Sequence, residues 1–208
     1  MKLTVTTFLS LDGVMQGPGG PEEDPSDGFD LGGWLVPFAD EDMGRHVVEW
    51  MATADALLLG RTTYEIFAAH WPRVTDEHDP VAAALNTLPK YVATRTLESA
   101  AWEGTTLLTG DVVEQVRELK SRPGRDLQVH GSAGLLQTLV AHDLVDEYRL
   151  FVYPVVLGRG KRLFGAGAVP ATMRHVATRT TGAGVTVHTY ERAGDPVFGS
   201  FALDPERS

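Results

Sequence analysis

The amino-acid sequence predicts a single α/β domain: a mixed, mainly parallel sheet flanked by helices, with an antiparallel hairpin at its C-terminal end. Through the first two-thirds of the 208-residue chain, short strand-like runs alternate with helical patterns, as in βαβ units. The last third shows alternating patterns without a convincing helix between them. A hydrophobic content of 43% is ordinary for a globular core. We place the domain at residues 1–192 and a polar tail at 193–208.

The first half of the chain opens with an alternating segment, Lys2–Leu9, which predicts a strand. Glycine and proline predict a long loop over 13–42, in which several aromatic residues favour partial order. Helical spacing of apolar residues over 43–54 follows three acidic residues that complement a helix dipole. The apolar run Ala56–Leu59 is typical of a strand buried on both faces, and a helix is expected over 62–72.

The second half continues the same alternation before it changes character. We expect strands at Tyr91–Ala93, Thr105–Leu108 and Leu127–His130, and helices over 112–120, with Asp111 as its cap, and over 135–140. The alternating segments Glu147–Tyr153, Thr172–Thr180 and Gly184–Glu191 predict three further strands, the last two joined by a hairpin turn over 181–184.

Composition excludes several classes of function. The chain has 18 Lys and Arg against 28 Asp and Glu, a net charge of −10, so we expect no nucleic-acid or membrane partner. The absence of cysteine excludes disulfides, thiolate metal sites and cysteine nucleophiles, and we expect no metal. Neither a signal peptide nor an apolar run long enough to span a membrane is present, which predicts a cytoplasmic protein.

Three predicted strands end in residues that favour anions. A Gly-Arg turn opens into a helix at 60–63, a basic residue stands between two hydroxyls at 94–96, and small residues follow a strand at 131–134. Taken singly, such features are more often an ordinary turn, a surface arginine or a helix cap. Together they predict a phosphate-bearing ligand, because ligands bind at the carboxyl ends of strands in open α/β sheets. The segment 131–134 is not the G-x-G-x-x-G fingerprint of an ordinary Rossmann domain.

The order of these segments resembles the dihydrofolate-reductase-like fold. In particular it is similar to the C-terminal reductase domain of the bifunctional riboflavin-biosynthesis deaminase-reductase and its stand-alone relatives, over residues 2–191. The resemblance rests on Ser10–Gly13, Gly60–Thr63, Gly131–Leu135 and the stretch from Leu144–Glu147 into Pro154–Gly160. The turn Leu157–Gly160 is its most specific part.

The resemblance implies an NADPH-dependent reductase that passes hydride to a pteridine- or pyrimidine-like substrate, of the 5-amino-6-(5-phosphoribosylamino)uracil reductase type. Arg95 would distinguish NADPH from NADH, because a guanidinium suits a dianionic phosphate. The loop at 15–16 would flank the nicotinamide. The residues expected to bind the cofactor are Thr7, Gly60, Arg61, Thr62, Thr63, Thr94, Arg95, Thr96, Gly131, Ser132, Ala133, Gly134 and Leu135.

Reduction of a C=N bond also needs a proton. The candidate donors are Asp12, Asp42 with its acidic neighbours, and His130; each has a structural alternative as a turn, a charged first helical turn or a strand end. Candidates for substrate binding are Trp34, Trp71 and Arg73, with core packing as the alternative for Trp71. We interpret the basic residues at 159–162 as exposed charges on a hairpin rather than as a phosphate site.

The chain also departs from the bifunctional enzyme. Without cysteine it cannot contain the zinc deaminase, whose signature needs P-C-x-x-C, and the Gly/Pro loop over 17–33 departs from the reductase pattern, so the native substrate stays open. One alternative is a nucleotide-binding module of the same fold that has lost turnover. A second is a scaffold whose function is its dimer surface. We expect a homodimer, for which the C-terminal strands could supply an apolar face.

Overall fold

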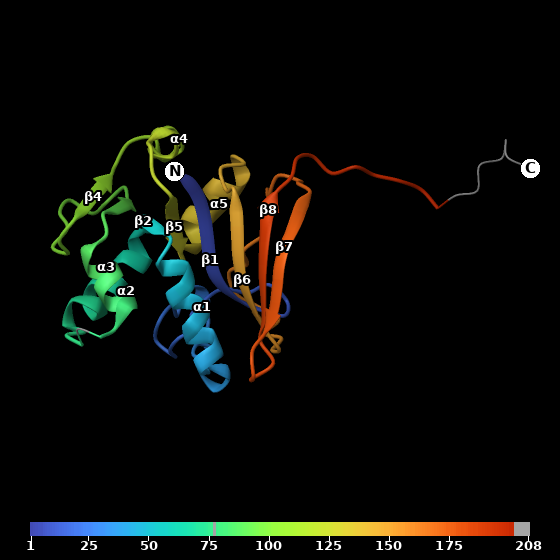
Figure 1. Ribbon diagram of the computed structural model, residues 1–208, viewed down its shortest axis with the longest axis horizontal. Coiled ribbons are helices and arrows are strands. Elements are labelled where there is room, and N and C mark those ends of the chain that lie inside the picture. The colour runs from blue at the N-terminus through green and yellow to red at the C-terminus, as the bar shows by residue number, and fades with distance from the viewer. Residues whose placement is uncertain (77, 202–208) are drawn as a thin grey trace, which may run out of the picture.

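The computed structural model describes residues 1–76 and 78–201. It contains one eight-stranded sheet with helices on both faces (Figure 1). The strands are β1 (Lys2–Ser10), β2 (Ala54–Gly60), β3 (Lys90–Ala93), β4 (Thr105–Leu108), β5 (Asp126–His130), β6 (Glu147–Tyr153), β7 (Met173–Thr180) and β8 (Thr186–Arg192). The helices are α1 (Glu41–Met51), α2 (Arg61–His70), α3 (Pro80–Thr87), α4 (Val112–Ser121) and α5 (Ala133–Ala141).

The sheet has the order β4-β3-β2-β5-β1-β6-β8-β7. Strands β1 to β6 pair in parallel, whereas β8 is antiparallel to both β6 and β7. The predicted fold class, a mainly parallel sheet with a C-terminal antiparallel hairpin, is therefore confirmed. Because the first six strands run the same way, all their carboxyl ends meet at one edge of the sheet.

Two helical layers cover the sheet. Helices α4 and α5 pack on one face, and α1, α2 and α3 pack on the other (Figure 1). The run Leu57–Leu59 shows why β2 is apolar throughout: Leu58 belongs to the first layer's core, whereas Leu57 and Leu59 belong to the second. All three side chains are fully buried, which confirms the prediction of a strand buried on both faces.

Helix α3 is an element that the sequence analysis did not predict. Asp79 caps it by accepting hydrogen bonds from the amides of Val81 and Ala82 at 2.8 and 3.0 Å, and Pro80 stands in its first turn, where no intrahelical donor is needed. The helix has only 8 residues, three of them consecutive alanines, so its apolar periodicity is too weak to recognise in the sequence.

The long segment from Gly13 to Asp42 is ordered, as its aromatic residues indicated. Two backbone hydrogen bonds close it on itself, from Gly33 N to Gly17 O at 2.8 Å and from Leu35 N to Pro18 O at 3.1 Å. It contains the short 3-10 turns η1 (Ser26–Gly28) and η2 (Val36–Phe38). The Trp34 indole donates to Gln16 O at 2.8 Å, which fixes the start of the loop.

The same loop is tied to a distant part of the chain. Met15 N donates to Lys161 O at 2.8 Å, and Lys161 N donates to the Gln16 side-chain oxygen at 3.0 Å. A third 3-10 turn, η3 (Trp71–Arg73), follows α2.

At the other terminus, Ala193 N donates to Thr172 O and Gly194 O accepts from Thr172 N, both at 2.8 Å. The chain then extends away from the sheet (Figure 1), and the part of the expected tail over 202–208 lies outside the described residues.

Gly160 is where the loop and the segment before β7 approach most closely. Its φ is +118°, and a Cβ there would lie 2.6 Å from Val14 Cγ1 and 2.9 Å from Phe29 Cε2. Gly158 also has a positive φ, +77°, but open space around it. Comparison of the two glycines therefore separates the cost of a positive φ, which both would carry, from the cost of crowding by a Cβ, which only Gly160 would carry.

We predict that Gly160→Ala destabilises the protein more than Gly158→Ala. Both variants carry the backbone cost of a left-handed residue, about 1–2 kcal/mol, but only Gly160→Ala also overpacks the contact with Val14 and Phe29, which costs about 1–3 kcal/mol more. Urea unfolding of both variants measures the difference. Equal losses of unfolding free energy would contradict the close approach at Gly160.

Candidate functional site

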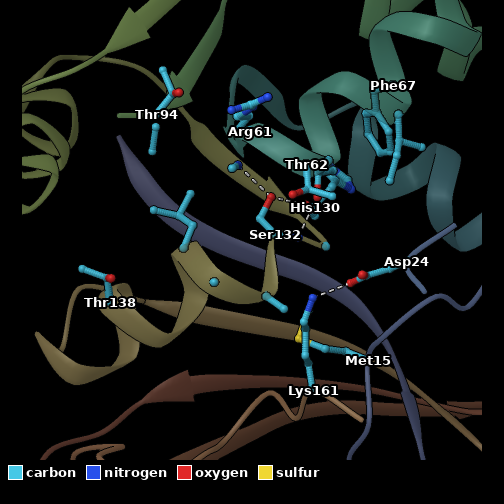
Figure 2. A pocket seen from close by; sticks show the side chains of 18 of the residues that line it. Met15, Asp24, Arg61, Thr62, Phe67, Thr94, His130, Ser132, Thr138 and Lys161 are labelled. Atoms are coloured by element: carbon cyan, nitrogen blue, oxygen red, sulfur yellow. Dashed lines mark hydrogen bonds and ion pairs between the residues drawn. The ribbon is translucent and has the colours of Figure 1, made fainter. Parts of the chain in front are cut away.

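A cavity of about 740 Å³ lies at the carboxyl edge of the parallel strands. It is lined by the ends of β2, β3, β4 and β5, the middle of β1, and the N-termini of α2, α4 and α5. This is the position at which open α/β sheets bind ligands. Figure 2 shows Arg61 and Thr94 on one side of the cavity, Met15, Asp24 and Lys161 on another, and Thr62, His130 and Ser132 between them.

The cavity brings together all the residues predicted to bind a cofactor. Segments far apart in the sequence meet here because parallel strands present their carboxyl ends at one edge. The lining includes Thr7, Gly60, Arg61, Thr62, Thr63, Thr94, Arg95, Thr96, Gly131, Ser132, Ala133, Gly134 and Leu135, and also His130.

Two helices point uncapped N-termini into this cavity. Among the described residues, no side chain caps α2 after Gly60 or α5 after Ser132. The first amides of an α-helix lack intrahelical partners and carry the positive end of the helix dipole. The third helix, α4, differs, because the Asp111 carboxylate accepts from the amides of Val113 and Glu114 at 2.9 and 3.3 Å. The cavity therefore offers an anion two helix N-termini, those of α2 and α5.

Ser132 fastens these two N-termini to each other. Its hydroxyl accepts from Gly60 N at 2.9 Å and donates to His130 O at 2.8 Å, while its amide donates to the Thr63 hydroxyl at 3.0 Å. Ser132 has a φ of +59° and follows Gly131 at +53°. A left-handed serine costs about 1–2 kcal/mol, which the three hydrogen bonds offset. The turn after β5 thereby stays locked to the start of α2.

One end of the cavity is cationic. Arg61 donates to Glu65 at 2.7 Å and also bonds the Thr96 hydroxyl. The Thr94 hydroxyl accepts from the amides of Thr96 and Leu97 at 3.2 and 2.9 Å and so shapes the turn after β3. Arg95 is exposed in that turn and has no hydrogen-bond or ion-pair partner among residues 1–76 and 78–201. Its charge is free to meet an anion.

The opposite end, which we call the acidic end, is formed by Glu23, Asp24, Lys161 and the segment 15–18. Lys161 Nζ lies 2.7 Å from Asp24 Oδ2 and 2.6 Å from the Ser26 hydroxyl. Burial opposes ionisation of Asp24, but the hydrogen bonds from Lys161 and Ser26 and the lysine charge hold the pKa of Asp24 below its usual value. Burial raises the pKa of Glu23.

Sequence reasoning named the segment 15–16 of this end but missed its charged side chains. The basic residues at 159–162 were interpreted as exposed charges on a hairpin, yet Lys161 lines the cavity. The available signal was an acidic pair inside a loop too long to be a plain connection. The neighbouring charges, Arg159 and Arg162, bond Asp30 and Asp12 respectively.

His130 lines the cavity beneath the turn of Ser132. Its Nε2 lies 3.1 Å from Gln128 Oε1. Gln128 Nε2 donates to Trp50 O at 2.6 Å and contacts the Thr53 hydroxyl at 3.2 Å, which fixes the amide so that its oxygen faces the imidazole. Gln128 Oε1 can only accept, so Nε2 carries the ring proton in the neutral imidazole and Nδ1 is an acceptor.

Two predicted catalytic residues lie outside the cavity. Asp12 accepts from the amides of Leu157 and Gly158 at 3.1 and 2.9 Å, so it holds the turn after β6. Hydrogen bonds from Ser10 and Leu157 keep the pKa of Asp12 well below its usual range. Asp42 accepts from Gly182 N at 3.0 Å and bonds Arg45, so it joins α1 to the β7–β8 hairpin. Both carboxylates serve backbone amides remote from the cavity lining.

The three residues predicted to bind substrate also lie outside the lining. Trp34 is buried and packs edge-on against Tyr153 with the ring centroids 5.4 Å apart. Trp71 packs edge-on against Phe67 at 6.2 Å, and Arg73 is exposed in η3. Burial of a tryptophan ring in the core stabilises the fold more than exposure of the same ring in an open site, because burial removes apolar surface from water. Phe67, rather than Trp71, reaches the cavity.

Nothing in residues 1–76 and 78–201 forms a helix long and apolar enough to cross a membrane. Across the same residues, no three or more His, Asp or Glu side chains gather as a metal site.

Comparison with known proteins gives the same fold. Dihydrofolate reductase from Enterococcus faecalis, complexed with NADP(H), matches 92% of this chain and 96% of its own with a TM-score of 0.59 and 16% identity. The diaminohydroxyphosphoribosylaminopyrimidine deaminase/5-amino-6-(5-phosphoribosylamino)uracil reductase of Thermotoga maritima matches 92% of this chain, but 56% of its own, with a TM-score of 0.60 and 15% identity.

A sequence relative matches along nearly its whole length. The uncharacterized protein YyaP of Bacillus subtilis (strain 168) is 29% identical over 195 residues, which cover 93% of this chain and 96% of the relative. Residues 1–187 match the family described as RibD C-terminal domain, and this confirms the resemblance predicted from the strand-end segments. The same cavity lies at the carboxyl edge of a dihydrofolate-reductase-like fold, and the chain belongs to the RibD C-terminal domain family.

Proposed function

We propose that the protein is an NADPH-dependent reductase that transfers hydride to a planar pyrimidine- or pteridine-like heterocycle. The observation that carries the proposal is the pair of uncapped N-termini of α2 and α5, which face one cavity beside Arg95, a side chain with no partner among the described residues. Family membership supports an oxidoreductase, and a neighbour of the same fold is described as complexed with NADP(H).

The residues present fit a dinucleotide. The amides at 61–63 and 133–135 would hold its pyrophosphate, because helix N-termini bind phosphate oxygens. Arg95, with Arg61 and Thr96 beside it, would hold the 2′-phosphate. The Thr6 hydroxyl is buried in the cavity lining and has no partner among the described residues; a bound ligand would satisfy it, since buried polar groups are almost always hydrogen-bonded.

When bound, NADPH would supply a hydride, two electrons with one proton, to the carbon of a C=N bond, whose nitrogen then takes a proton from the protein or water. Thr7, His130 and Met15 line the same cavity and would enclose the reacting rings. His130 would act as a hydrogen-bond acceptor through Nδ1, which suits an N–H or O–H of the ligand.

The proton would come from the acidic end rather than from His130. Burial, helped by the charge of Arg149, lowers the pKa of His130 to about 4, so the ring is neutral at pH 7 and its single proton is held by Gln128. Burial raises the pKa of Glu23, which lines the cavity. We therefore assign proton relay to Glu23, whose carboxylate would take a proton from water and pass it to the reduced nitrogen, and acceptance of a ligand donor to His130.

A second candidate function is a nucleotide-binding module without turnover. It is favoured by one observation: Asp12 and Asp42 are engaged elsewhere, His130 is neutral and Asp24 is paired with Lys161, which leaves proton supply to Glu23. Oxidation of NADPH with dihydrofolate or a ribosylaminouracil as acceptor would exclude this candidate.

The proposal also includes a homodimer in the cytoplasm. Strand β7 is the edge of the sheet, and Val176 on it is 44% exposed. A second copy could cover this edge, since unpaired edge strands readily pair with another chain.

We predict that Arg95→Ala weakens NADP⁺ binding by about 10- to 100-fold and leaves NAD⁺ binding unchanged, because a charge-assisted hydrogen bond contributes about 1.5–3 kcal/mol. Calorimetric titration of both nucleotides measures the two affinities. The matched control is Arg179→Ala, which removes an exposed arginine from β7. Equal affinity of Arg95→Ala and the native protein for NADP⁺ would remove Arg95 from the site.

We predict that His130 makes the protein less stable as the pH decreases from about 6.5 to about 4. In this window the unfolded chain binds a proton at His130, near its ordinary pKa of about 6.5, whereas the folded protein does not until about pH 4. The contribution of the neutral ring to the free energy of unfolding is fully present above pH 6.5. It decreases by about 1.4 kcal/mol for each pH unit as the pH falls from 6.5 to 4.

Urea unfolding of the native protein and of His130→Gln at pH 7.5, 5.5 and 4.5 measures this contribution. The native protein should lose more unfolding free energy than His130→Gln as the pH falls. The control is His142→Gln, at an exposed position. Parallel losses in the native protein and His130→Gln would show that the ring accepts a proton in the folded state.

A further inference from the structure

The charges of the acidic end are already satisfied within the protein. Lys161 pairs with Asp24 at 2.7 Å and is the cationic side chain that lines this end among the described residues. The flanking arginines are also engaged. Arg159, which lines a smaller cavity sharing Gln16 and Lys161, bonds Asp30. Arg162 lies 3.2 Å from Asp12 and also bonds its main-chain oxygen.

The loop over 17–33 adds negative charge to the same place. It supplies Glu23 as well as Asp24. Its position is fixed, because Gln16 Nε2 donates to Asp24 O at 3.1 Å and Ser26 O at 3.0 Å, and Glu23 accepts from Gly19 N. Two carboxyl groups therefore face this end against one lysine, which is already paired.

A phosphate at this end would have to displace Asp24 from Lys161. That would leave a half-buried carboxylate without its cation beside a dianion, and an unpaired charge away from water is costly. At the opposite end, a phosphate would meet Arg95, which has no partner in residues 1–76 and 78–201, and the N-termini of α2 and α5, which no side chain of those residues caps. The cavity thus separates an anion-accepting end from one that rejects anions.

The acidic end instead presents carboxylate oxygens, which are hydrogen-bond acceptors, in a cavity that apolar side chains also line. The carboxylates accept from N–H groups, and the apolar side chains suit a flat ring. The apolar residues that line the same cavity include Phe8, Met15, Ile66 and Phe67.

We infer that the substrate is an N–H-rich planar heterocycle that carries no phosphate, bound at the acidic end by Glu23 and Asp24 while Lys161 stays paired. This rests on the proposed function, and it differs from the phosphorylated compound in the name of the Thermotoga maritima neighbour.

The test uses the full chain saturated with NADP⁺, so that binding is measured without turnover. Calorimetry compares 5-amino-6-(ribosylamino)uracil with its 5′-phosphate, and 7,8-dihydroneopterin with its monophosphate. In every pair that binds, the member without phosphate should bind tenfold or more tightly than its partner. The inference is overturned if a phosphorylated member binds as tightly as its partner or more tightly, or if neither member without phosphate binds. Failure of NADP⁺ itself to bind would instead overturn the proposed function.

The variant Asp24→Asn releases Lys161 from its ion pair. We expect the preference against the phosphorylated member to shrink by about tenfold, which corresponds to about 1.4 kcal/mol, because the freed ammonium can then meet the phosphate. The matched control is Glu118→Gln, which makes the same change in net charge by freeing Arg122 on the surface of α4. If Asp24→Asn weakens both members equally, Asp24 serves only the structure of the loop and the inference fails.

Discussion

The hydrogen bonds of Ser132 are the interaction on which the site depends. They join the turn after β5 to the start of α2, and they hold Ser132 itself at a φ of +59°. Because the serine hydroxyl is used in this link, it does not cap α5. The same side chain therefore brings two helix N-termini together and leaves the amides of α5 open. An alanine there would lose the link, and an ordinary cap would close the anion site.

Charge is distributed over the cavity by two different parts of the chain. The strand ends and helix N-termini of the sheet supply the cationic end, whereas the long loop supplies the acidic end. With a net charge of −10, the protein as a whole repels anions, so the proposed anionic ligand would be held where Arg61, Arg95 and the open amides act together. The ion pair of Lys161 and Asp24 keeps the far end from becoming a second such site.

The sequence was sufficient to predict the sheet and the gathering of the strand ends. Buried runs such as Leu57–Leu59 reveal strands covered on both faces, and parallel strands must share an edge. It was insufficient wherever a side chain's role depends on a partner far along the chain. Asp12 serves amides about 145 residues away, and Trp34 faces Tyr153.

The acidic end was hidden for the same reason. The position of Asp24 depends on Gln16 and on Lys161, which is 137 residues distant. No local pattern signals that a loop carboxylate and a residue of a basic run meet in a cavity. Helix α3 was missed for a different reason, since eight residues rich in alanine show little periodicity.

An NMR titration with NADP⁺, following the backbone amides, tests the central claim most directly. The account requires the largest shifts at the amides of 61–63 and 133–135, where the N-termini of α2 and α5 are open. The amides of Val113 and Glu114, which Asp111 already caps, serve as the internal reference and should shift little. Large shifts at α4 with none at α2 and α5 would contradict the assignment of the anion site.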